Sequence, residues 1–565
     1  MSSVPKSLHY SLILALTAAL YVNALPGAWH YDDFHSVADN LALRSLANVP
    51  RFFTDPTTFS ANPEMAMYRP VLLVSYAVQY AITGPGVGWW HLGNVMLHGA
   101  NACLVGWIGA SLIGPAGVAA GYLFAAHPLA TEPVNYVSGR SDLLMALWWL
   151  VALGLAVRYP IKRGWLIWAF VGLALLTKES AVTLPAVLLL AWAVPHRGLL
   201  ASPWWRGKAV AAVALLCVWV NLSKWVGTIG DSLDHPVRSW LSQAITQVML
   251  LPTYLGLLVW PVGLTVEHEA VALSSPVWQT WVTLAGLLVV AALVPWMWRR
   301  SRLAVFLLAW GVLALLPVLV MPLNVLLNER RLYLPLAAAC VGAVVFLGWA
   351  WQGHRRTAVA TVIAGVTVLG GLTLARNPVW ASELALWEDA VVKGPTMPRS
   401  WIWYGNSLAD LARQYRAGGN REAELRTWRR AAACFQCVRE IATTKTLYCR
   451  ATNNLGSVWL DLGRVDRAEP LFREALALDS TYADAWVNLA HCSSARAMRE
   501  SGPRLTEQWG VVHDQYIRAL KLSAHHLEAN VGLSKMWYAV GDTSWGRYYL
   551  ARAREVRPDD VRWQR

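Results

Sequence analysis

Charged residues are scarce in this chain. Asp, Glu, Lys and Arg make up 15% of its 565 residues, whereas about a quarter is usual for a soluble domain. Hydrophobic residues account for 56%, and the mean hydropathy is +0.37. Apolar runs of roughly 17 to 25 residues, long enough to cross a bilayer, recur between Leu8 and Ala375. The composition excludes an ordinary water-soluble protein and predicts an all-α, polytopic membrane domain followed by a soluble tail.

The sequence also lacks the signatures of other protein classes. It has no run of Lys and Arg and no zinc-finger spacing, so its net charge of +14 does not predict a nucleic-acid partner. It has no Gly-rich phosphate loop, which argues against a soluble nucleotide-binding domain. No small-residue cleavage site follows the first apolar run, 8–25, and we therefore expect an uncleaved first span.

Basic residues gather in four short loops, at 158–163, 196–208, 299–302 and 354–356. The positive-inside rule places such loops in the cytoplasm. This placement predicts about eleven spans: 8–25, 89–112, 115–127, 140–157, 164–177, 180–195, 208–226, 276–298, 302–320, 331–350 and 357–375. The apolar segments 71–82 and 241–262 are then predicted not to cross, and the second contains Pro252 and Pro261, as expected for a surface-lying or re-entrant helix.

An odd number of crossings that begins inside the cell ends outside it. The tail after Asn377 is therefore predicted to be extracytoplasmic. The same topology places five clusters of mixed charge on the outer face, although these clusters were not used to choose it. They are Asp32-Asp33, the turn from His127 to Arg140, Lys178-Glu179, Glu267-His268-Glu269 and Asn328-Glu329-Arg330-Arg331. Ionisable groups at span edges usually face a polar cavity, so this convergence favours an enzyme.

The tail contains an internal repeat with the residue spacing of tetratricopeptide helical hairpins. One unit is marked by Asn454-Leu455-Gly456, Trp459, Ala468, Phe472 and Ala475. Leu489-Ala490 repeats Leu455-Gly456 after 34 residues, and Leu533-Ser534 repeats it again after an insertion of about ten residues between Arg496 and Gln508. A degenerate earlier unit includes Leu408-Ala409 and Trp428. We predict a membrane domain over 1–376, a linker over 377–400 and a repeat α-solenoid over 401–565.

Three tail cysteines are close in sequence: Cys434, Cys437 and Cys449. In an extracytoplasmic tail, a disulfide from one of the first two to Cys449 is compatible with their spacing. A zinc site is less favoured, since no fourth ligand has a recognisable spacing.

The charged segments together resemble the transmembrane and tetratricopeptide-repeat-containing O-mannosyltransferases and their bacterial relatives. The resemblance rests on Tyr31-Asp32-Asp33-Phe34-His35, His127-Pro128, Thr131-Glu132-Pro133, Gly139-Arg140-Ser141-Asp142, Lys178-Glu179-Ser180 and Glu329-Arg330-Arg331. It covers nearly the whole chain, although the second basic residue of Arg330-Arg331 leaves the phosphate-binding position ambiguous.

That family implies a C-type glycosyltransferase fold. It also implies an activity that moves mannose from a polyprenyl-phosphate carrier to Ser or Thr hydroxyls of proteins, outside the cytoplasm. The carrier is undecaprenyl phosphate in a bacterial host, with the repeats in the periplasm, or dolichyl phosphate in an endoplasmic-reticulum membrane, with the repeats in the lumen. No cofactor is required by such chemistry, and a divalent cation is compatible with it.

This reaction needs a base for the acceptor hydroxyl and cations for the departing phosphate. The expected base is Asp33 or Asp32, with Asp33 preferred, and Glu132 is the next choice or orients the acceptor or a metal. The expected phosphate ligands are Lys178, Arg330, Arg331 and Arg140. The supporting residues are His35, His127, Asp142, Glu179 and Glu329.

Each of these residues also has a structural interpretation. One aspartate caps a loop or pairs with Arg69, Arg140 pairs with Glu132 or Asp142, and one of the two neighbouring arginines pairs with Glu329. His127, before Pro128, is favoured as a turn residue. Two other functions stay open as well: a membrane-anchored scaffold without activity, and the same enzyme class acting on a glycan or lipid.

Overall fold

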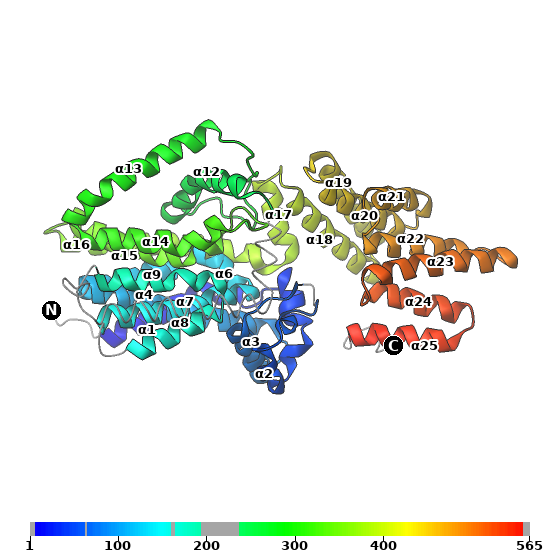
Figure 1. Cartoon of the computed structure of the whole chain (residues 1–565), viewed down its shortest axis with the longest axis horizontal. Coiled ribbons are helices and arrows are strands. Elements are labelled where there is room, and N and C mark those ends of the chain that lie inside the picture. Colours follow the sequence, from blue (N-terminus) through cyan, green and yellow to red (C-terminus); the bar gives the residue numbers. More distant parts are fainter. Residues whose placement is uncertain (1–5, 63–64, 160–163, 194–236, 558–565) are drawn as a thin grey trace. The chain divides into compact units, whose positions relative to one another are not determined.

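The computed structural model describes residues 6–62, 65–159, 164–193 and 237–557, and within these ranges every regular element is a helix (Figure 1). The chain divides into two compact units, Met1–Leu386 and Trp387–Arg565. The division falls inside the predicted linker, which is itself largely helical, with η13 at Asn377–Ala381 and α17 at Glu383–Lys393. The all-α class, with apolar helices followed by helical hairpins, is confirmed.

Eight helices in the described ranges are long and apolar enough to cross a membrane. They are α1 (Lys6–Tyr21), α4 (Val87–Ile113), α7 (Arg140–Arg158), α12 (Trp240–Val259), α13 (Trp278–Arg300), α14 (Arg302–Val320), α15 (Tyr333–Ala350) and α16 (Arg355–Arg376). Seven of them coincide with predicted spans. The exception is α12, which we predicted not to cross although it has the length and composition to do so.

Three other predicted spans contain only short helices: α5 (Ala119–Ala126), α8 (Gly164–Leu175) and α9 (Leu184–Ala193). A crossing needs about 20 helical residues, and within the described residues none of these three helices reaches that length. The predicted span 208–226 and the basic loop 196–208 lie outside the described residues. Helix α3 (Pro70–Thr83), predicted not to cross, is also short, with 14 residues. The number of eleven crossings therefore stays a prediction.

The core of the first unit forms where α4 packs on α1, α5 and α7, and α15 packs on α5 and α14. Small residues allow backbones to approach closely in such bundles. A Cβ atom added to Gly121 of α5 would lie 2.6 Å from the carbonyl oxygen of Ala102 in α4. The glycine at this crossing is therefore required by packing.

Short helices at one end of this bundle carry the charged clusters. They are η2 (Phe34–Ala38), η8 (Pro128–Ala130), α6 (Thr131–Asn135), η9 (Val137–Gly139), η10 (Glu179–Thr183) and η12 (Glu329–Leu332). A helix of so few turns leaves most of its backbone groups without intrahelical partners. In η9 and η12, carboxylates from distant segments accept from such backbone N–H groups: Asp33 at Val137 and Ser138, and Glu132 at Arg330.

The second unit consists of four helical hairpins in the described part of the tail (Figure 1). They are α18–α19 (Pro398–Ala417, Arg421–Ile441), α20–α21 (Lys445–Asp461, Val465–Leu478), α22–α23 (Ala483–Ala497, Pro503–Leu522) and α24–α25 (Leu527–Ala539, Thr543–Val556). These hairpins confirm the predicted repeat fold.

Leu408, Ala409 and Trp428 of the predicted degenerate unit are buried in the first hairpin, and its closest glycine contact lies one helical turn earlier in α18. In α20, Gly456 faces Phe472 of α21, and a Cβ at Gly456 would lie 2.7 Å from that ring. The residue of α18 in the same relation to α19 is Gly405, which faces Phe435 at 2.7 Å, and not Ala409. Both helices of the first hairpin are longer than those of the second, so residue spacing alone did not locate the contact.

The predicted disulfide is wrong. Cys434, Cys437 and Cys449 are all free cysteines. The Cys449 side chain faces α21, where its Sγ donates to the carbonyl oxygen of Ala475 at 3.3 Å. The Cys449 thiol is therefore engaged by α21, whereas the other two cysteines lie on α19.

Candidate functional site

The adjacent carboxylates Asp32 and Asp33 have opposite environments. Asp33 is fully buried. Its carboxylate accepts hydrogen bonds from the backbone N–H groups of His30 (3.0 Å), Val137 (3.3 Å) and Ser138 (2.7 Å), and from the Ser138 hydroxyl (2.6 Å). Burial raises the pKa of Asp33 to about 6, although the Ser138 hydrogen bond and the His30 charge oppose this rise. Asp33 therefore fastens the loop after α1 to the start of η9.

The Asp32 side chain is 53% exposed, and its Oδ1 lies 3.5 Å from His35 Nε2. Partial burial acts to raise the pKa of Asp32, but the hydrogen bond with His35 and the positive charge of Arg330 outweigh it and lower this pKa to about 2. Asp32 is therefore ionised at neutral pH and open to a substrate. The two environments favour Asp32 over Asp33 as the base and reverse our preference from sequence.

Arg330, whose charge acts on Asp32, shares the Asp142 carboxylate with Lys178. Lys178 Nζ lies 2.5 Å from Asp142 Oδ1, and Arg330 Nε lies 4.0 Å from Asp142 Oδ2. Arg330 Nε is also 3.8 Å from Glu132 Oε1. Both cations remain partly accessible, with 15% of the Lys178 side chain and 26% of the Arg330 side chain exposed. Lys178 and Arg330 can each exchange these carboxylates for a bound phosphate, since ammonium and guanidinium groups are the usual protein ligands of phosphate.

A stacked aromatic pair lies against Arg330. The rings of Tyr31 and Tyr136 are stacked with centroids 4.6 Å apart. The Arg330 guanidinium lies over the Tyr136 ring at 5.4 Å. A cation held over an aromatic face keeps N–H groups at its edge for other partners.

Glu132 is buried, and its Oε2 accepts a hydrogen bond from the Arg330 backbone N–H at 3.1 Å. Burial raises its pKa, and the neighbouring Glu329 raises it further, whereas Arg330 opposes the shift. A buried carboxylate that accepts from the backbone of a cation can position that cation, and this geometry favours such a role for Glu132 over that of the base.

Arg69 is a residue of this region that the sequence analysis did not select as a ligand. It precedes Pro70 at the start of α3 and forms a bidentate pair with Glu179, at 2.6 and 3.1 Å. Neither Asp32 nor Asp33 pairs with Arg69, so the predicted pairing of one of these aspartates with Arg69 is wrong. The signal in the sequence that could have pointed to Arg69 is its position directly before the segment 71–82, which we predicted not to cross the membrane.

Two predicted phosphate ligands face away from this region. Arg140 is buried, donates from Nε to Asn94 Oδ1 at 3.0 Å and from Nη2 to the Trp90 carbonyl at 3.1 Å. Arg331 donates to the carbonyl oxygens of Leu326 and Val325, at 3.1 and 2.7 Å. Both arginines donate to backbone or amide oxygens of neighbouring helices and loops, and we therefore do not include them among the candidate phosphate ligands.

The predicted pairing of Glu329 with a neighbouring arginine is not found at its Oε1, and His127 has the predicted role of a turn residue. Glu329 does not pair with either neighbouring arginine through its Oε1, which accepts from the Thr265 backbone N–H at 2.5 Å and lies 2.9 Å from His268 Nε2. His127 is a turn residue: its Nδ1 accepts from the Leu129 N–H at 3.3 Å, and its Nε2 lies 3.3 Å from the carbonyl oxygen of Leu258.

Among the described residues, no group of three or more His, Cys, Asp and Glu side chains is arranged to hold a metal ion. The carboxylates of this region are engaged by Lys178, Arg330, Arg69 and backbone N–H groups. We derive no step that involves a metal.

Known proteins that are similar to this chain carry the same family name as the resemblance based on the charged segments. Protein O-mannosyl-transferase F38B6.6 of Caenorhabditis elegans is 24% identical over 441 residues, which cover 74% of this chain and 61% of the relative. Protein O-mannosyl-transferase TMTC3 of Mus musculus is 21% identical over 566 residues, covering 85% of this chain and 61% of the relative. The chain is similar to proteins named as O-mannosyltransferases over most of its length.

The likeness to these O-mannosyltransferases is strongest over a shorter region. Protein O-mannosyl-transferase TMTC2 of Mus musculus is 32% identical over 189 residues, or 31% of this chain and 22% of the relative. The chain thus spans about three fifths or less of the length of these curated relatives. No family model matches the chain.

The solved structures that match this chain do so with low TM-scores. A double mutant of MamA has a TM-score of 0.22 and 17% identity, covering 32% of this chain and 85% of MamA. YrrB, titled a TPR protein with an unusual peptide-binding site, has a TM-score of 0.21 and 14% identity, covering 38% of this chain and 94% of YrrB. TM-scores this low establish no common overall fold.

Proposed function

We propose that this protein is a membrane glycosyltransferase that moves a sugar, mannose, from a polyprenyl-phosphate carrier to Ser or Thr hydroxyls of a protein acceptor. The observation that carries the proposal is an exposed, ionised Asp32 beside Arg330, a partly accessible cation that lies 4.0 Å from the carboxylate of Asp142, to which Lys178 is paired. The names of the relatives supply mannose and the protein acceptor.

The donor phosphate binds to the edge of the Arg330 guanidinium and to Lys178. A guanidinium binds phosphate oxygens in a bidentate manner, and an ammonium group adds a point charge. Because phosphate is a good leaving group that these cations stabilise, no acid is needed to protonate it. The catalytic cations are thus required in the ground state and in the transition state.

Asp32 takes the proton from the acceptor hydroxyl as the oxygen attacks the sugar carbon from the side opposite the phosphate. The carbon–oxygen bond to phosphate breaks, and the configuration at the sugar carbon is inverted. Arg330 lowers the pKa of Asp32 in the free protein. A bound phosphate offsets the Arg330 charge, so donor binding raises the pKa of Asp32 and makes it a stronger base.

Asp33 and Glu132 hold this arrangement without touching the substrate. Asp33 fixes the backbone on both sides of the site, at His30 and at Ser138. Glu132 fixes the backbone of Arg330. Positioning of this kind is effective because small displacements of catalytic groups reduce rates strongly.

The proposed reaction takes place outside the cytoplasm, with Asp32 and the repeat unit on the same side. In a bacterial inner membrane that side is the periplasm, and undecaprenyl phosphate is the carrier. In an endoplasmic-reticulum membrane it is the lumen, and the carrier is dolichyl phosphate. A single cysteine introduced at the exposed Gln414, in a chain without its native cysteines, will react with an impermeant reagent in intact spheroplasts; protection there contradicts the topology.

The test of the reaction is transfer by the purified protein in lipid nanodiscs. We expect labelled mannose to move to a Ser/Thr-rich protein from polyprenyl-phosphate-mannose and not from a nucleotide sugar. A scaffold without activity shows no transfer from either donor. Transfer to a glycan or lipid, but to no protein tested, supports the alternative acceptor.

A further inference from the structure

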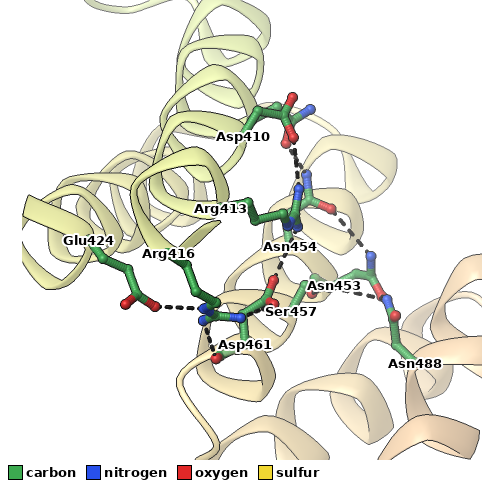
Figure 2. Close-up of polar contacts among 10 residues, drawn as sticks. Asp410, Arg413, Arg416, Glu424, Asn453, Asn454, Ser457, Asp461 and Asn488 are labelled. Carbon is green, nitrogen blue, oxygen red and sulfur yellow. Dashed lines mark hydrogen bonds and ion pairs between the residues drawn. The ribbon is translucent and has the colours of Figure 1, made fainter. Parts of the chain in front are cut away.

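A chain of side-chain hydrogen bonds joins the first helices of three consecutive hairpins (Figure 2). The Asn488 amide in α22 donates to Asn453 Oδ1 (2.9 Å) and Ser457 Oγ (3.2 Å) in α20. Asn453 donates to Asn454 Oδ1 (3.2 Å), and Asn454 donates to Asn406 Oδ1 of α18 (3.0 Å). We call Asn406, Asn453, Asn454 and Asn488 the amide ladder.

The amide ladder keeps hydrogen-bonding capacity at its surface. A carboxamide has two N–H donors and an oxygen with two lone pairs. Within the described residues, the Asn406 side-chain nitrogen and the Asn488 side-chain oxygen have no hydrogen-bond partner. Asn406, Asn454 and Asn488 are partly exposed, whereas Asn453 is buried. The ladder therefore presents both a donor end and an acceptor end to an incoming group.

The charged residues next to the ladder are paired with one another. Arg413 binds Asp410 (2.7 Å) and Asp461 (3.1 Å), and Arg416 binds Glu424 (2.7 Å) and Asp461 (3.3 Å), as Figure 2 shows. Mutually compensated charges give little preference for an acidic or a basic ligand. The groups of this face that remain able to form new hydrogen bonds are the neutral amides of the ladder.

We propose that the amide ladder binds an extended polypeptide through its backbone. A peptide unit offers the same N–H donor and C=O acceptor as a carboxamide, so the match does not depend on sequence. Packed helices lie about 8–10 Å apart, which corresponds to about three residues of extended chain at about 3.3 Å each. Successive hairpins therefore meet every third peptide unit or so.

This inference rests on the proposed function in one respect: the bound polypeptide is taken to be the acceptor. Sequence-independent binding suits an enzyme that must present many different Ser and Thr residues. The competing explanation is that the ladder only joins neighbouring repeats and binds no ligand.

Binding of a short fluorescent peptide of Gly, Ala, Ser and Thr to the full-length protein in nanodiscs tests the inference. We expect the triple variant Asn406→Ala, Asn454→Ala and Asn488→Ala to bind about tenfold more weakly or worse, since several hydrogen bonds of modest net value are lost together. The matched control is Gln414→Ala, which removes an exposed amide of α18 that makes no side-chain hydrogen bond in the described structure. This control should bind as the wild type does.

A second probe requires no variant and is informative even if the triple variant does not fold. The same peptide, methylated on its backbone nitrogens at every third residue, keeps its side chains but loses N–H donors. The wild type should bind it about tenfold more weakly than the parent peptide. Equal affinity for the two peptides overturns the inference, as does wild-type affinity in a folded triple variant.

The two proposals fail separately. Loss of peptide binding with transfer to protein unchanged contradicts the role of the ladder and leaves the glycosyltransferase in place. Peptide binding through the ladder in a protein that transfers no sugar supports the ladder and contradicts the enzyme.

Discussion

The Ser138 hydroxyl donates a hydrogen bond of 2.6 Å to the carboxylate of Asp33, across 105 positions of sequence. This contact ties the loop after α1 to the turn before α7 and leaves the neighbouring Asp32 exposed beside Arg330. Adjacent carboxylates thus have separate roles: Asp33 fixes the backbone, and Asp32 faces the region where a substrate binds.

Replacing Asp33 should reduce stability more than replacing Asp32. In Asp33→Asn, the new amide N–H group opposes the N–H donors of His30 or Ser138, so one buried donor loses its partner. We expect a loss of about 1–3 kcal/mol in the free energy of unfolding, measured by thermal or denaturant unfolding in detergent. The control is Asp32→Asn, at a half-exposed position. A loss that is equal in the two variants contradicts the division of roles.

The accessible cations should contribute to donor affinity. Arg330→Ala and Lys178→Gln each remove a charge that holds phosphate in the ground state and the transition state alike, so both binding and turnover fall. We expect an affinity for polyprenyl-phosphate-mannose at least tenfold weaker in each, because charge-assisted hydrogen bonds contribute about 1.5–3 kcal/mol. Arg51→Ala, which removes an exposed arginine paired with Asp55, is the control. Wild-type donor affinity in both site variants excludes this phosphate site.

Close helix packing in the repeats predicts opposite effects for two glycines. A Cβ at Gly456 would lie 2.7 Å from the Phe472 ring, whereas a Cβ at Gly510, in α23, would meet no atom within 4 Å. Gly456→Ala should destabilise the repeat unit by about 1–3 kcal/mol, and Gly510→Ala should stabilise it by up to about 1 kcal/mol. Thermal unfolding of the full chain, followed by limited proteolysis of the tail, measures both. The same sign for the two variants argues against the hairpin geometry.

The contact between His30 and Glu383 should make stability depend on pH. His30 Nδ1 lies 2.7 Å from Glu383 Oε1. Burial acts to lower the pKa of His30, but the hydrogen bond and the charge of Glu383 raise it above its ordinary value. Its contribution is therefore complete below the unfolded pKa of about 6.5 and is lost as pH rises through the higher folded pKa. His30→Gln should lower the melting temperature more at pH 6 than at pH 9, and a deficit that grows with pH contradicts this assignment.

The sequence predicted the features that repeat or that depend on hydrophobic length. Long apolar runs predicted seven of the candidate spans, and residue spacing predicted the hairpin that contains Gly456 and Phe472. The charge pattern also predicted that Asp32, Lys178 and Arg330 lie on the same face of the membrane. These inferences need only periodicity and the sign of charge.

The choice between neighbouring residues was not predictable in this way. Asp32 and Asp33 differ in burial because Ser138 lies beside only one of them. Arg330 and Arg331 differ because the carbonyl oxygens of Val325 and Leu326 face only the second. Arg140 is buried by Asn94 and Trp90, from another helix. The environment of each of these residues depends on a partner distant in sequence or on the direction of a side chain in a short helix. A hydropathy pattern predicts neither of these.

Donor binding and sugar transfer in Asp32→Asn test the central claim most directly. Asparagine keeps the shape of the side chain but cannot accept a proton, and general-base catalysis contributes about 10²–10⁴-fold. We expect transfer from polyprenyl-phosphate-mannose to fall by that factor, while the affinity for the donor and the melting temperature stay close to those of the wild type. Near-normal transfer by a folded Asp32→Asn protein would contradict the account, because the base would then lie elsewhere.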